Sequence, residues 1–215
     1  MSFKPLSREF LLNRGYCCNN GCKNCPYKEN KMELKTVMRT NEGAKQGLID
    51  LCNTIKQKFG DVKTFVEVGS FMGESAVIFA EQFPNATIYC IDPWLSGYDQ
   101  KDSASSFDFK DVENQFDLRT KSFNNIVKIK DFSTNVDIKC DVVYIDGLHT
   151  YQGVKADILH WMPKVSSVIC GHDYYEDEAF LLQHPHIAGV KKAVDELLGV
   201  PDKLFIEGSW LKWKI

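Results

Sequence analysis

The stretch TFVEVGSFMGES, Thr64 to Ser75, decides the fold of this chain. Its first five residues are β-branched or aromatic around one glutamate, a composition that predicts a buried strand. Gly69 and Gly73 follow the strand, and residues 74–83 place apolar side chains at helical spacing. A strand, a glycine-bearing turn and a helix form the first half of a nucleotide-binding βαβ unit, in which the helix N-terminus faces the ligand.

A carboxylate that holds ribose hydroxyls is expected at the end of the next strand. Asp92 ends the run ATIYCID, about twenty residues after the glycine turn, where such a carboxylate is expected. The turn itself reads Glu67-x-Gly69-x-x-x-Gly73 and differs from the dinucleotide fingerprint GxGxxG, because Phe71 stands where a middle glycine would be. With this pattern the chain resembles class I S-adenosylmethionine methyltransferases.

That resemblance implies a Rossmann-like α/β fold, with a seven-stranded sheet that ends in an antiparallel hairpin, and S-adenosylmethionine as the cofactor. It places the cofactor-binding residues in the turn after the first strand and at the ends of the second, third and fourth strands. These are Glu67, Gly69, Ser70, Phe71, Gly73, Ser75, Asp92, Trp94, Asp131, Phe132, Ser133 and Asp146. For Ser133, a cap of a short helix is an equal alternative.

Hydrophobic periodicity predicts five alternating strand–helix units and a terminal hairpin. The expected strands are 64–68, 86–91, 126–130, 141–145 and 165–170, and the hairpin pairs 204–206 with 210–215. The expected helices are 6–12, 41–59, 74–83, 107–123, 151–161 and 190–198. Two loops, 95–106 and 175–188, leave the carboxyl edge of the sheet, so the first is a candidate lid and both are expected to select the substrate.

Length and composition fit an ordinary globular enzyme. The chain has 215 residues and a net charge of −3, which provides no electrostatic footprint for bulk nucleic acid. It has no apolar run of signal-peptide or membrane-span length, so we expect a cytoplasmic protein without membrane contact. A small-molecule acceptor is the expected partner, and a homo-oligomer is compatible with the sequence.

Four of the eight cysteines lie within nine residues, in the run RGYCCNNGCKNCPY. Cys17, Cys18, Cys22 and Cys25 suit zinc or an iron–sulfur cluster, and unliganded or redox-sensing thiols are the alternative. The run resembles an uncharacterised bacterial family with the signature RGYCCxxGCxxCPY. We therefore predict a metal-binding knuckle over residues 1–30 and a methyltransferase domain over 31–215.

Two carboxylates and two imidazoles follow the fourth and fifth strands. Asp146 and His149 belong to DGLHTY, and His172 and Asp173 to HDY. These motifs resemble, more distantly, metal-dependent sugar O-methyltransferases. The resemblance implies that Asp146 and Asp173 are metal ligands and that Asp146 and His149 are catalytic, with His149 as the general base. His172 stands where those enzymes have a carboxylate and joins the predicted ligands, so magnesium, manganese, zinc or no metal are all compatible.

The sequence thus predicts a methyltransferase that acts on an oxygen of a sugar or other small hydroxyl-bearing acceptor. Two alternatives stay open at this point. One is a nicotinamide-dependent oxidoreductase on a similar sheet, and the other is a non-enzymatic binding module in which the knuckle docks a partner.

Overall fold

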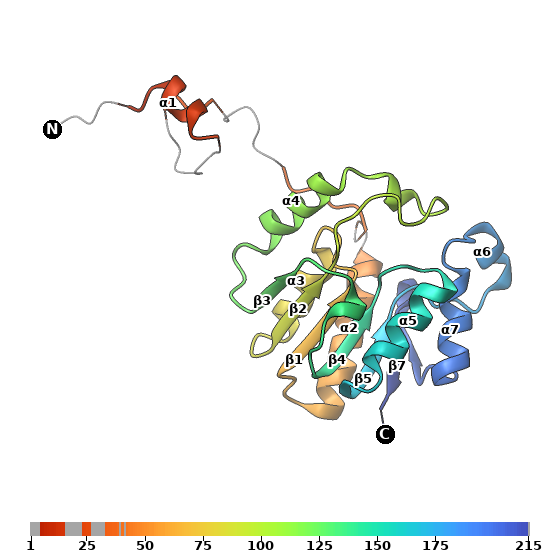
Figure 1. The fold of residues 1–215 in the computed structure, drawn as a ribbon. Helices are drawn as coiled ribbons and strands as arrows, with labels where there is room; N and C mark the ends of the chain where they lie inside the picture. Colours follow the sequence, from red (N-terminus) through yellow and green to blue (C-terminus); the bar gives the residue numbers. More distant parts are fainter. Residues whose placement is uncertain (1–4, 16–22, 27–32, 39, 41, 215) are drawn as a thin grey trace. The chain divides into compact units, whose positions relative to one another are not determined.

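The computed structural model describes residues 5–15, 23–26, 33–38, 40 and 42–214 (Figure 1). The chain divides into two compact units, Met1–Lys35 and Thr36–Ile215. The first contains helix α1, Arg8–Asn13, capped by Ser7, whose Oγ accepts the Phe10 N–H at 3.1 Å. Cys25 is buried, whereas Cys17, Cys18 and Cys22 lie outside the described residues, so the metal-binding knuckle stays a prediction.

The second unit is built on one seven-stranded sheet of order β3-β2-β1-β4-β5-β7-β6. The first five of these neighbours are parallel, β7 runs antiparallel to β5, and β6 runs antiparallel to β7. The strands are β1 Thr64–Val68, β2 Thr87–Ile91, β3 Ile126–Ile129, β4 Cys140–Ile145, β5 Val165–Gly171, β6 Lys203–Leu204 and β7 Trp210–Trp213. The predicted sheet and its antiparallel end are confirmed.

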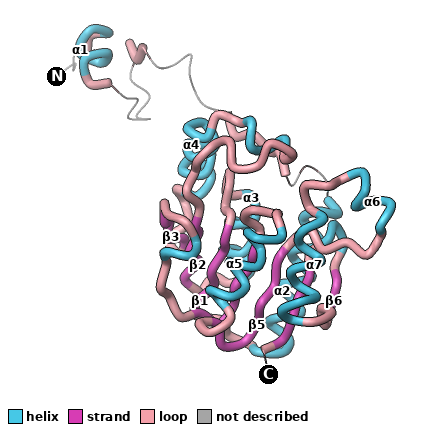
Figure 2. Tube along the Cα trace, turned by 45° about the vertical axis from the view of Figure 1, so that its right-hand side comes forward, coloured by secondary structure: helices cyan, strands magenta, loops and turns pink. Residues whose placement is uncertain are grey.

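Helices cover both faces of the sheet (Figures 1 and 2). The α-helices are α2 Glu42–Phe59, α3 Glu74–Gln82, α4 Phe109–Thr120, α5 Tyr151–Trp161, α6 Glu178–Gln183 and α7 Ala188–Leu198. Short 3₁₀ turns are η2 Ser103–Ser106, η3 Ser133–Asn135 and η4 Ile206–Gly208. α2 packs on α3 and α3 on α4, while α5 packs on α7 and η3, so the helices form two layers.

Successive side chains along each strand point to opposite faces of the sheet, so each helix layer packs on its own hydrophobic core. On β4, Val142 and Tyr144 join the core under α2, α3 and α4, whereas Val143 and Ile145 join the core under α5 and α7. Cys52, Cys90, Cys140 and Cys170 are buried in these cores, as expected for small apolar side chains.

Two segments differ from the expected elements. The insertion 175–188 contains helix α6, which begins after Asp177 because that side chain accepts the Ala179 and Phe180 N–H groups. The hairpin is shorter than predicted, because Glu207 adopts a positive φ of 64° and η4 ends the pairing. No described helix is long and apolar enough to cross a membrane.

Candidate active site

The glycine turn, Gly69–Gly73, carries three residues in the left-handed backbone region. Gly69 and Gly73 have φ values of 85° and 76°, and Phe71 has a φ of 44°. Phe71 thus takes a conformation that favours glycine and is strained for a bulky side chain. Its N–H donates to Asp92 Oδ2 at 2.9 Å, its carbonyl accepts the Trp94 Nε1–H at 2.9 Å, and its ring packs on Phe107 and Phe109. These contacts stabilise Phe71 in the left-handed conformation that a glycine would otherwise adopt at this position.

Gly69 joins the ends of β1 and β4. A Cβ at this position would lie 2.0 Å from the Asp146 carbonyl oxygen and 2.7 Å from the Gly147 Cα. The absence of a side chain therefore brings the glycine turn against the backbone of Asp146, as the predicted order of these two strands requires.

Glu67 lies beneath the turn and is fully buried. Burial raises the pKa of Glu67 to about 7, although the nearby Ser75 and Ser70 hydroxyls lower it. Ser70 Oγ donates to Oε2 at 2.7 Å, and no described residue meets hydrogen-bond geometry at the buried Oε1. Glu67 supports the turn through Ser70 and does not line the cavity described below, and its predicted part in cofactor binding stays a prediction.

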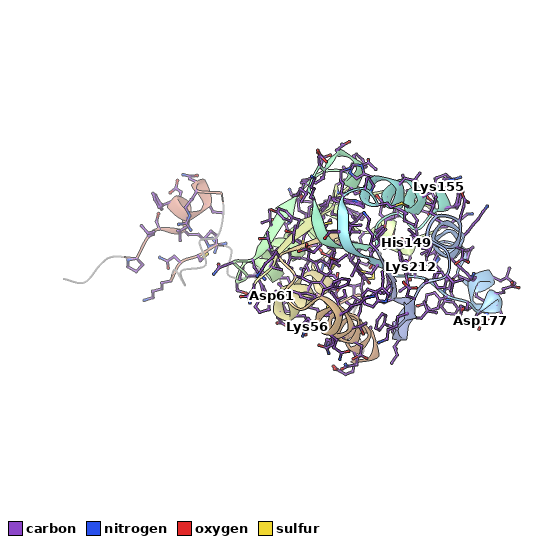
Figure 3. All side chains as sticks on the ribbon, turned by 90° about the horizontal axis from the view of Figure 1, so that it is seen from below. Lys56, Asp61, His149, Lys155, Asp177 and Lys212 are labelled. Carbon is purple, nitrogen blue, oxygen red and sulfur yellow. The ribbon has the colours of Figure 1, made fainter. Side chains whose placement is uncertain are left out.

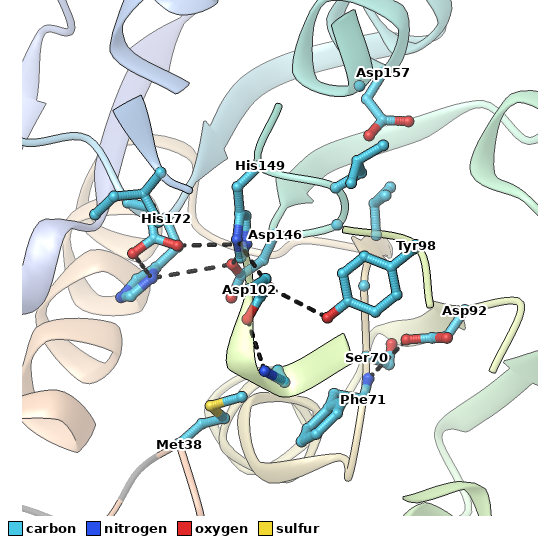
Figure 4. Close-up of a pocket in the computed structure, with 18 of the residues that line it drawn as sticks. Met38, Ser70, Phe71, Asp92, Tyr98, Asp102, Asp146, His149, Asp157 and His172 are labelled. Carbon is cyan, nitrogen blue, oxygen red and sulfur yellow. Dashed lines mark hydrogen bonds and ion pairs between the residues drawn. The ribbon is translucent and has the colours of Figure 1, made fainter. Parts of the chain in front are cut away.

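A cavity of about 590 Å³ opens at the carboxyl edge of the sheet (Figure 4). Its volume lies within the range of small-molecule sites. Both loops predicted to select the substrate contribute to its lining, through Leu95, Tyr98 and Asp102 on one side and Tyr175 and Phe180 on the other. Of the predicted site residues, those that line it are Gly69, Ser70, Phe71, Ser75, Asp92, Phe132, Ser133, Asp146, His149, His172 and Asp173.

Gly73, Trp94 and Asp131 lie outside this lining, and their predicted contact with the cofactor stays a prediction. The Trp94 indole is buried against Phe116, with ring centroids 5.0 Å apart, and donates to the Phe71 carbonyl. Asp131 is exposed, and its Oδ1 accepts the Phe132 N–H and an Asn135 Nδ2–H, so the carboxylate is used by the η3 turn.

Asp146, His149, His172 and Asp173, the carboxylate–imidazole cluster, meet in the cavity as the topology predicted (Figure 4). His149 Nε2 lies 3.4 Å from Asp146 Oδ1 and 3.3 Å from Asp173 Oδ2. His172 Nδ1 lies 3.1 Å from Asp173 Oδ1 and 4.0 Å from Asp146 Oδ1. One ligand atom each of Asp146, His149 and Asp173 falls within 4.8 Å of the others, so this group contains His149, whereas the sequence prediction placed His172 with the two carboxylates.

His149, labelled in Figure 3, is part-buried, with 19% of its side chain exposed. Burial alone would lower its pKa, but the hydrogen bond to Asp146 and the charges of Asp173, Asp146 and Asp102 raise it to about 9. The charges of the surrounding carboxylates therefore favour the protonated form of His149.

Asp102, on the candidate lid, is a residue that sequence reasoning missed. Its Oδ2 lies 3.7 Å from the buried His149 Nδ1 and accepts the Tyr98 hydroxyl at 3.2 Å, while its Oδ1 caps η2 through the Ala104 N–H at 2.8 Å. Asp102 itself is buried. A third carboxylate thus reaches the cluster from the loop 95–106, and only its position in a polar loop could have indicated this.

A family model described as a methyltransferase domain matches residues 66–174, just over half of the chain. The chain belongs to this family. A second model, for a family of unknown function, matches residues 3–31 of the methyltransferase, and a search of curated proteins found no match. Membership of the family makes the protein a methyl-transferring enzyme, so neither the oxidoreductase nor the non-enzymatic alternative is retained.

Solved structures share the fold of this methyltransferase. A Staphylococcus aureus protein assigned as a caffeoyl-CoA O-methyltransferase is 14% identical, with 88% of each chain covered and a TM-score of 0.57. The N-methyltransferase NodS from Bradyrhizobium japonicum WM9, in complex with S-adenosyl-L-homocysteine, is 13% identical over 87% of this chain and 96% of its own, with a TM-score of 0.57. Magnesium protoporphyrin IX methyltransferase from Synechocystis PCC 6803, with bound S-adenosylmethionine, is 10% identical over 80% of this chain and 78% of its own, with a TM-score of 0.51. At these identities the likeness establishes the fold and not the acceptor.

Proposed function

We propose that the methyltransferase transfers a methyl group from S-adenosylmethionine to a hydroxyl of a sugar or other small ring-bearing acceptor, with a divalent metal held by Asp146 and Asp173. The observation that carries this proposal is the meeting of Asp146, His149 and Asp173, with ligand atoms within 4.8 Å of one another, in the cavity beside the glycine turn.

The cavity fits the cofactor in its chemistry. The glycine turn and the first residues of α3 line the cavity. The N-terminus of a helix attracts negative charge, so this end of the cavity suits the carboxylate of the cofactor's methionine part. Asp92 is buried at the end of β2, and its two oxygens accept the N–H groups of Phe71 and Trp94. Each carboxylate oxygen has a second lone pair, so Asp92 can also accept a ribose hydroxyl.

The cluster also fits a divalent cation. Two carboxylates and an imidazole in one cavity suit manganese, zinc or iron, and suit magnesium less well. When bound, such an ion supplies positive charge that lowers the pKa of an acceptor hydroxyl and offsets the carboxylate charges around His149. Asp146 and Asp173 would hold it, and His172, 3.1 Å from Asp173, would orient that carboxylate or complete the ligand set.

Aromatic side chains support a ring-bearing acceptor. Tyr175, Phe180, His184 and His186 line the cavity in the insertion 175–188, and successive ring centroids lie 4.5, 4.2 and 6.0 Å apart. Such a wall offers stacking surface together with imidazole nitrogens for hydroxyl groups.

Methyl transfer to a hydroxyl requires that the acceptor oxygen is aligned with the methyl group of the cofactor and that one group accepts the hydroxyl proton. The acceptor oxygen forms its bond to the methyl carbon as the carbon–sulfur bond breaks, and S-adenosylhomocysteine leaves. In this proposal the neutral form of His149 takes the hydroxyl proton at Nε2. The Asp102 carboxylate, 3.7 Å from Nδ1, keeps the imidazole oriented and stabilises its charged form.

The test begins with calorimetric titration of S-adenosylhomocysteine, with NAD as the control ligand. Transfer of labelled methyl to sugars and polyols is then measured in chelated protein supplied with magnesium, manganese or zinc.

Asp146→Asn and Asp173→Asn should lose manganese binding and transfer, whereas Asp137→Asn, at an exposed carboxylate, should keep both. His149→Gln should keep manganese binding and lose transfer. Loss of manganese binding in that variant would make His149 a ligand instead, and transfer that survives chelation and all three variants would refute the metal-assisted mechanism.

A further inference from the structure

A buried carboxylate on α5 faces the same cavity and has no part in the mechanism above. Asp157 is 7% exposed and lines the cavity. Ser133 Oγ donates a short hydrogen bond to Asp157 Oδ1. Oδ2 accepts no hydrogen bond from any residue that the structure describes. One oxygen of this carboxylate is therefore fixed, and the other is available to a ligand in the cavity.

Asp157 lies at a different end of the cavity from the carboxylate–imidazole cluster. Figure 4 shows Asp157 and His172 on opposite sides of the view, with His149 between them. The residues around Asp157 come from η3 and from the start of α5: Phe132, Ser133, Thr134, Gly153 and Ala156 all line the cavity. On the lining face of α5, Asp157 is the only side chain with a polar group.

The cofactor has to extend into this region. Its methyl group must reach the cluster at the ends of β4 and β5, and its ribose is assigned to Asp92 at the end of β2. The remaining part, the adenine ring, continues toward the neighbouring strand β3, where the chain after the strand forms η3 beside Asp157. Asp131, one of the predicted cofactor-binding residues, is exposed and accepts hydrogen bonds from Phe132 and Asn135.

Resting on the proposed function, we propose that Asp157 recognises the adenine ring, with Oδ2 accepting a hydrogen bond from the 6-amino group and Ser133 fixing the carboxylate through Oδ1. The small side chain of Ala156 lines the cavity beside the carboxylate and leaves room there for a flat ring. Leu148 packs where a Cβ of Gly153 would lie, with its Cγ 2.8 Å from that position, and completes this wall.

The charge of Asp157 makes the recognition selective. Burial raises the pKa of Asp157 to about 6, against the lowering effect of Ser133, so the group is ionised at pH 8. An ionised carboxylate only accepts hydrogen bonds. It therefore matches the amino group of adenine and repels the carbonyl oxygen that replaces that group in hypoxanthine.

Calorimetric titration at pH 8 of the full chain with S-adenosylhomocysteine and with S-inosylhomocysteine tests this directly. We expect the inosine analogue to bind more weakly by about tenfold to a hundredfold, the effect of one hydrogen bond to a charged group. Equal affinities in the wild type would overturn the assignment of Asp157 while leaving the proposed function intact. Failure of S-adenosylhomocysteine itself to bind would overturn both.

In Asp157→Asn we measure the ratio of the two affinities, which a purely structural role of Asp157 would not change. A carboxamide can donate to the hypoxanthine carbonyl, so the preference for adenine should shrink or reverse in this variant. Ser133→Ala should weaken binding of S-adenosylhomocysteine and keep the direction of the preference. Asp131→Asn should leave the affinity ratio unchanged. An unchanged ratio in Asp157→Asn, or a lost preference in Asp131→Asn, would contradict the proposal, and thermal unfolding of each variant confirms that it is folded.

Discussion

Single residues set the shape of the glycine turn, and Gly69 differs from a left-handed glycine elsewhere in the chain. Gly69 has both a left-handed backbone and the Asp146 backbone where a side chain would be. Gly97, on the candidate lid, has a φ of 75° and nothing within 4 Å of its added Cβ. Substitutions at Gly69 and Gly97 therefore distinguish two effects, because both positions have a strained backbone but only Gly69 lacks space for a side chain.

We expect Gly69→Ala to lower the free energy of unfolding by about 3 kcal/mol and to abolish binding of S-adenosylhomocysteine, because the methyl group would push the β1 and β4 ends apart. Gly97→Ala should cost only the left-handed strain, about 1 kcal/mol, and keep binding. Chemical denaturation and calorimetry measure both. Equal losses in the two variants would refute the steric argument.

His149 makes stability depend on pH in a defined direction. Because its pKa is raised in the folded state from 6.5 to about 9, the favourable contribution is complete below pH 6.5 and disappears as pH rises through 9. In chelated protein, the unfolding free energy that His149→Gln removes should therefore shrink between pH 6.5 and 9.5, by on the order of 2 to 3 kcal/mol. A difference that grows with pH would contradict this charge assignment.

At this scale the sequence predicted the meeting of Asp146, His149, His172 and Asp173, because residues that end neighbouring parallel strands share one edge of the sheet. It did not predict Asp102 or Asp157. A carboxylate in a polar loop, or in the middle of a helix, carries no spacing that tells whether it turns toward a cavity. The backbone contacts that turn Asp131 outward are equally invisible in the sequence.

Among the elements, the loop 95–106 depends on one side chain for its conformation and for its contact with the cluster. Asp102 caps η2, accepts the Tyr98 hydroxyl and approaches His149. Asp108 offers a matched control, because it caps α4 through the Lys110 N–H and does not line the cavity.

We expect Asp102→Ala and Asp108→Ala each to cost about 1 kcal/mol of stability as lost caps. Only Asp102→Ala should also increase amide exchange across residues 95–106 and lower the methyl-transfer rate, because it alone removes the contact with His149. Hydrogen-exchange mass spectrometry and the labelled-methyl assay report these effects. Equal transfer rates in the two variants would show that the lid carboxylate has no part in the reaction.

The positions of the strands followed from the sequence because each strand is a short apolar run bounded by turn residues, while most boundaries differ from prediction by one to three residues. β1 and α5 agree residue for residue with prediction. The exceptions are segments whose structure is decided locally by side-chain caps or by strained backbone. α6 depends on the Asp177 cap, and the shortened hairpin depends on the left-handed Glu207.

For the whole molecule, the two hydrophobic cores lie within the second unit. Every buried member of both clusters, as far as the structure describes the chain, lies within residues 36–215. The strap formed by Val37 and Met38 also belongs to this unit, since Glu74 Oε1 accepts their N–H groups at 2.7 and 3.2 Å.

A chain of residues 36–215 should therefore unfold cooperatively, with a thermal midpoint within about 4 °C of the full chain, the shift that about 1 kcal/mol produces at this size. Its affinity for S-adenosylhomocysteine should be unchanged. Calorimetry of both chains checks this, and a truncated chain that is unfolded or cannot bind would assign residues 1–35 a part in the fold or in the site.

The antiparallel end of the sheet has a consequence for how the enzyme is made in the cell. Trp210 on β7 donates its indole N–H to the His172 carbonyl at 3.2 Å and fills the space left by Gly171. β7 emerges from the ribosome 38 residues after His172, and until it inserts beside β5 the end of that strand lacks its support. We therefore expect a nascent chain to complete the support of His172 only after translation has passed β7.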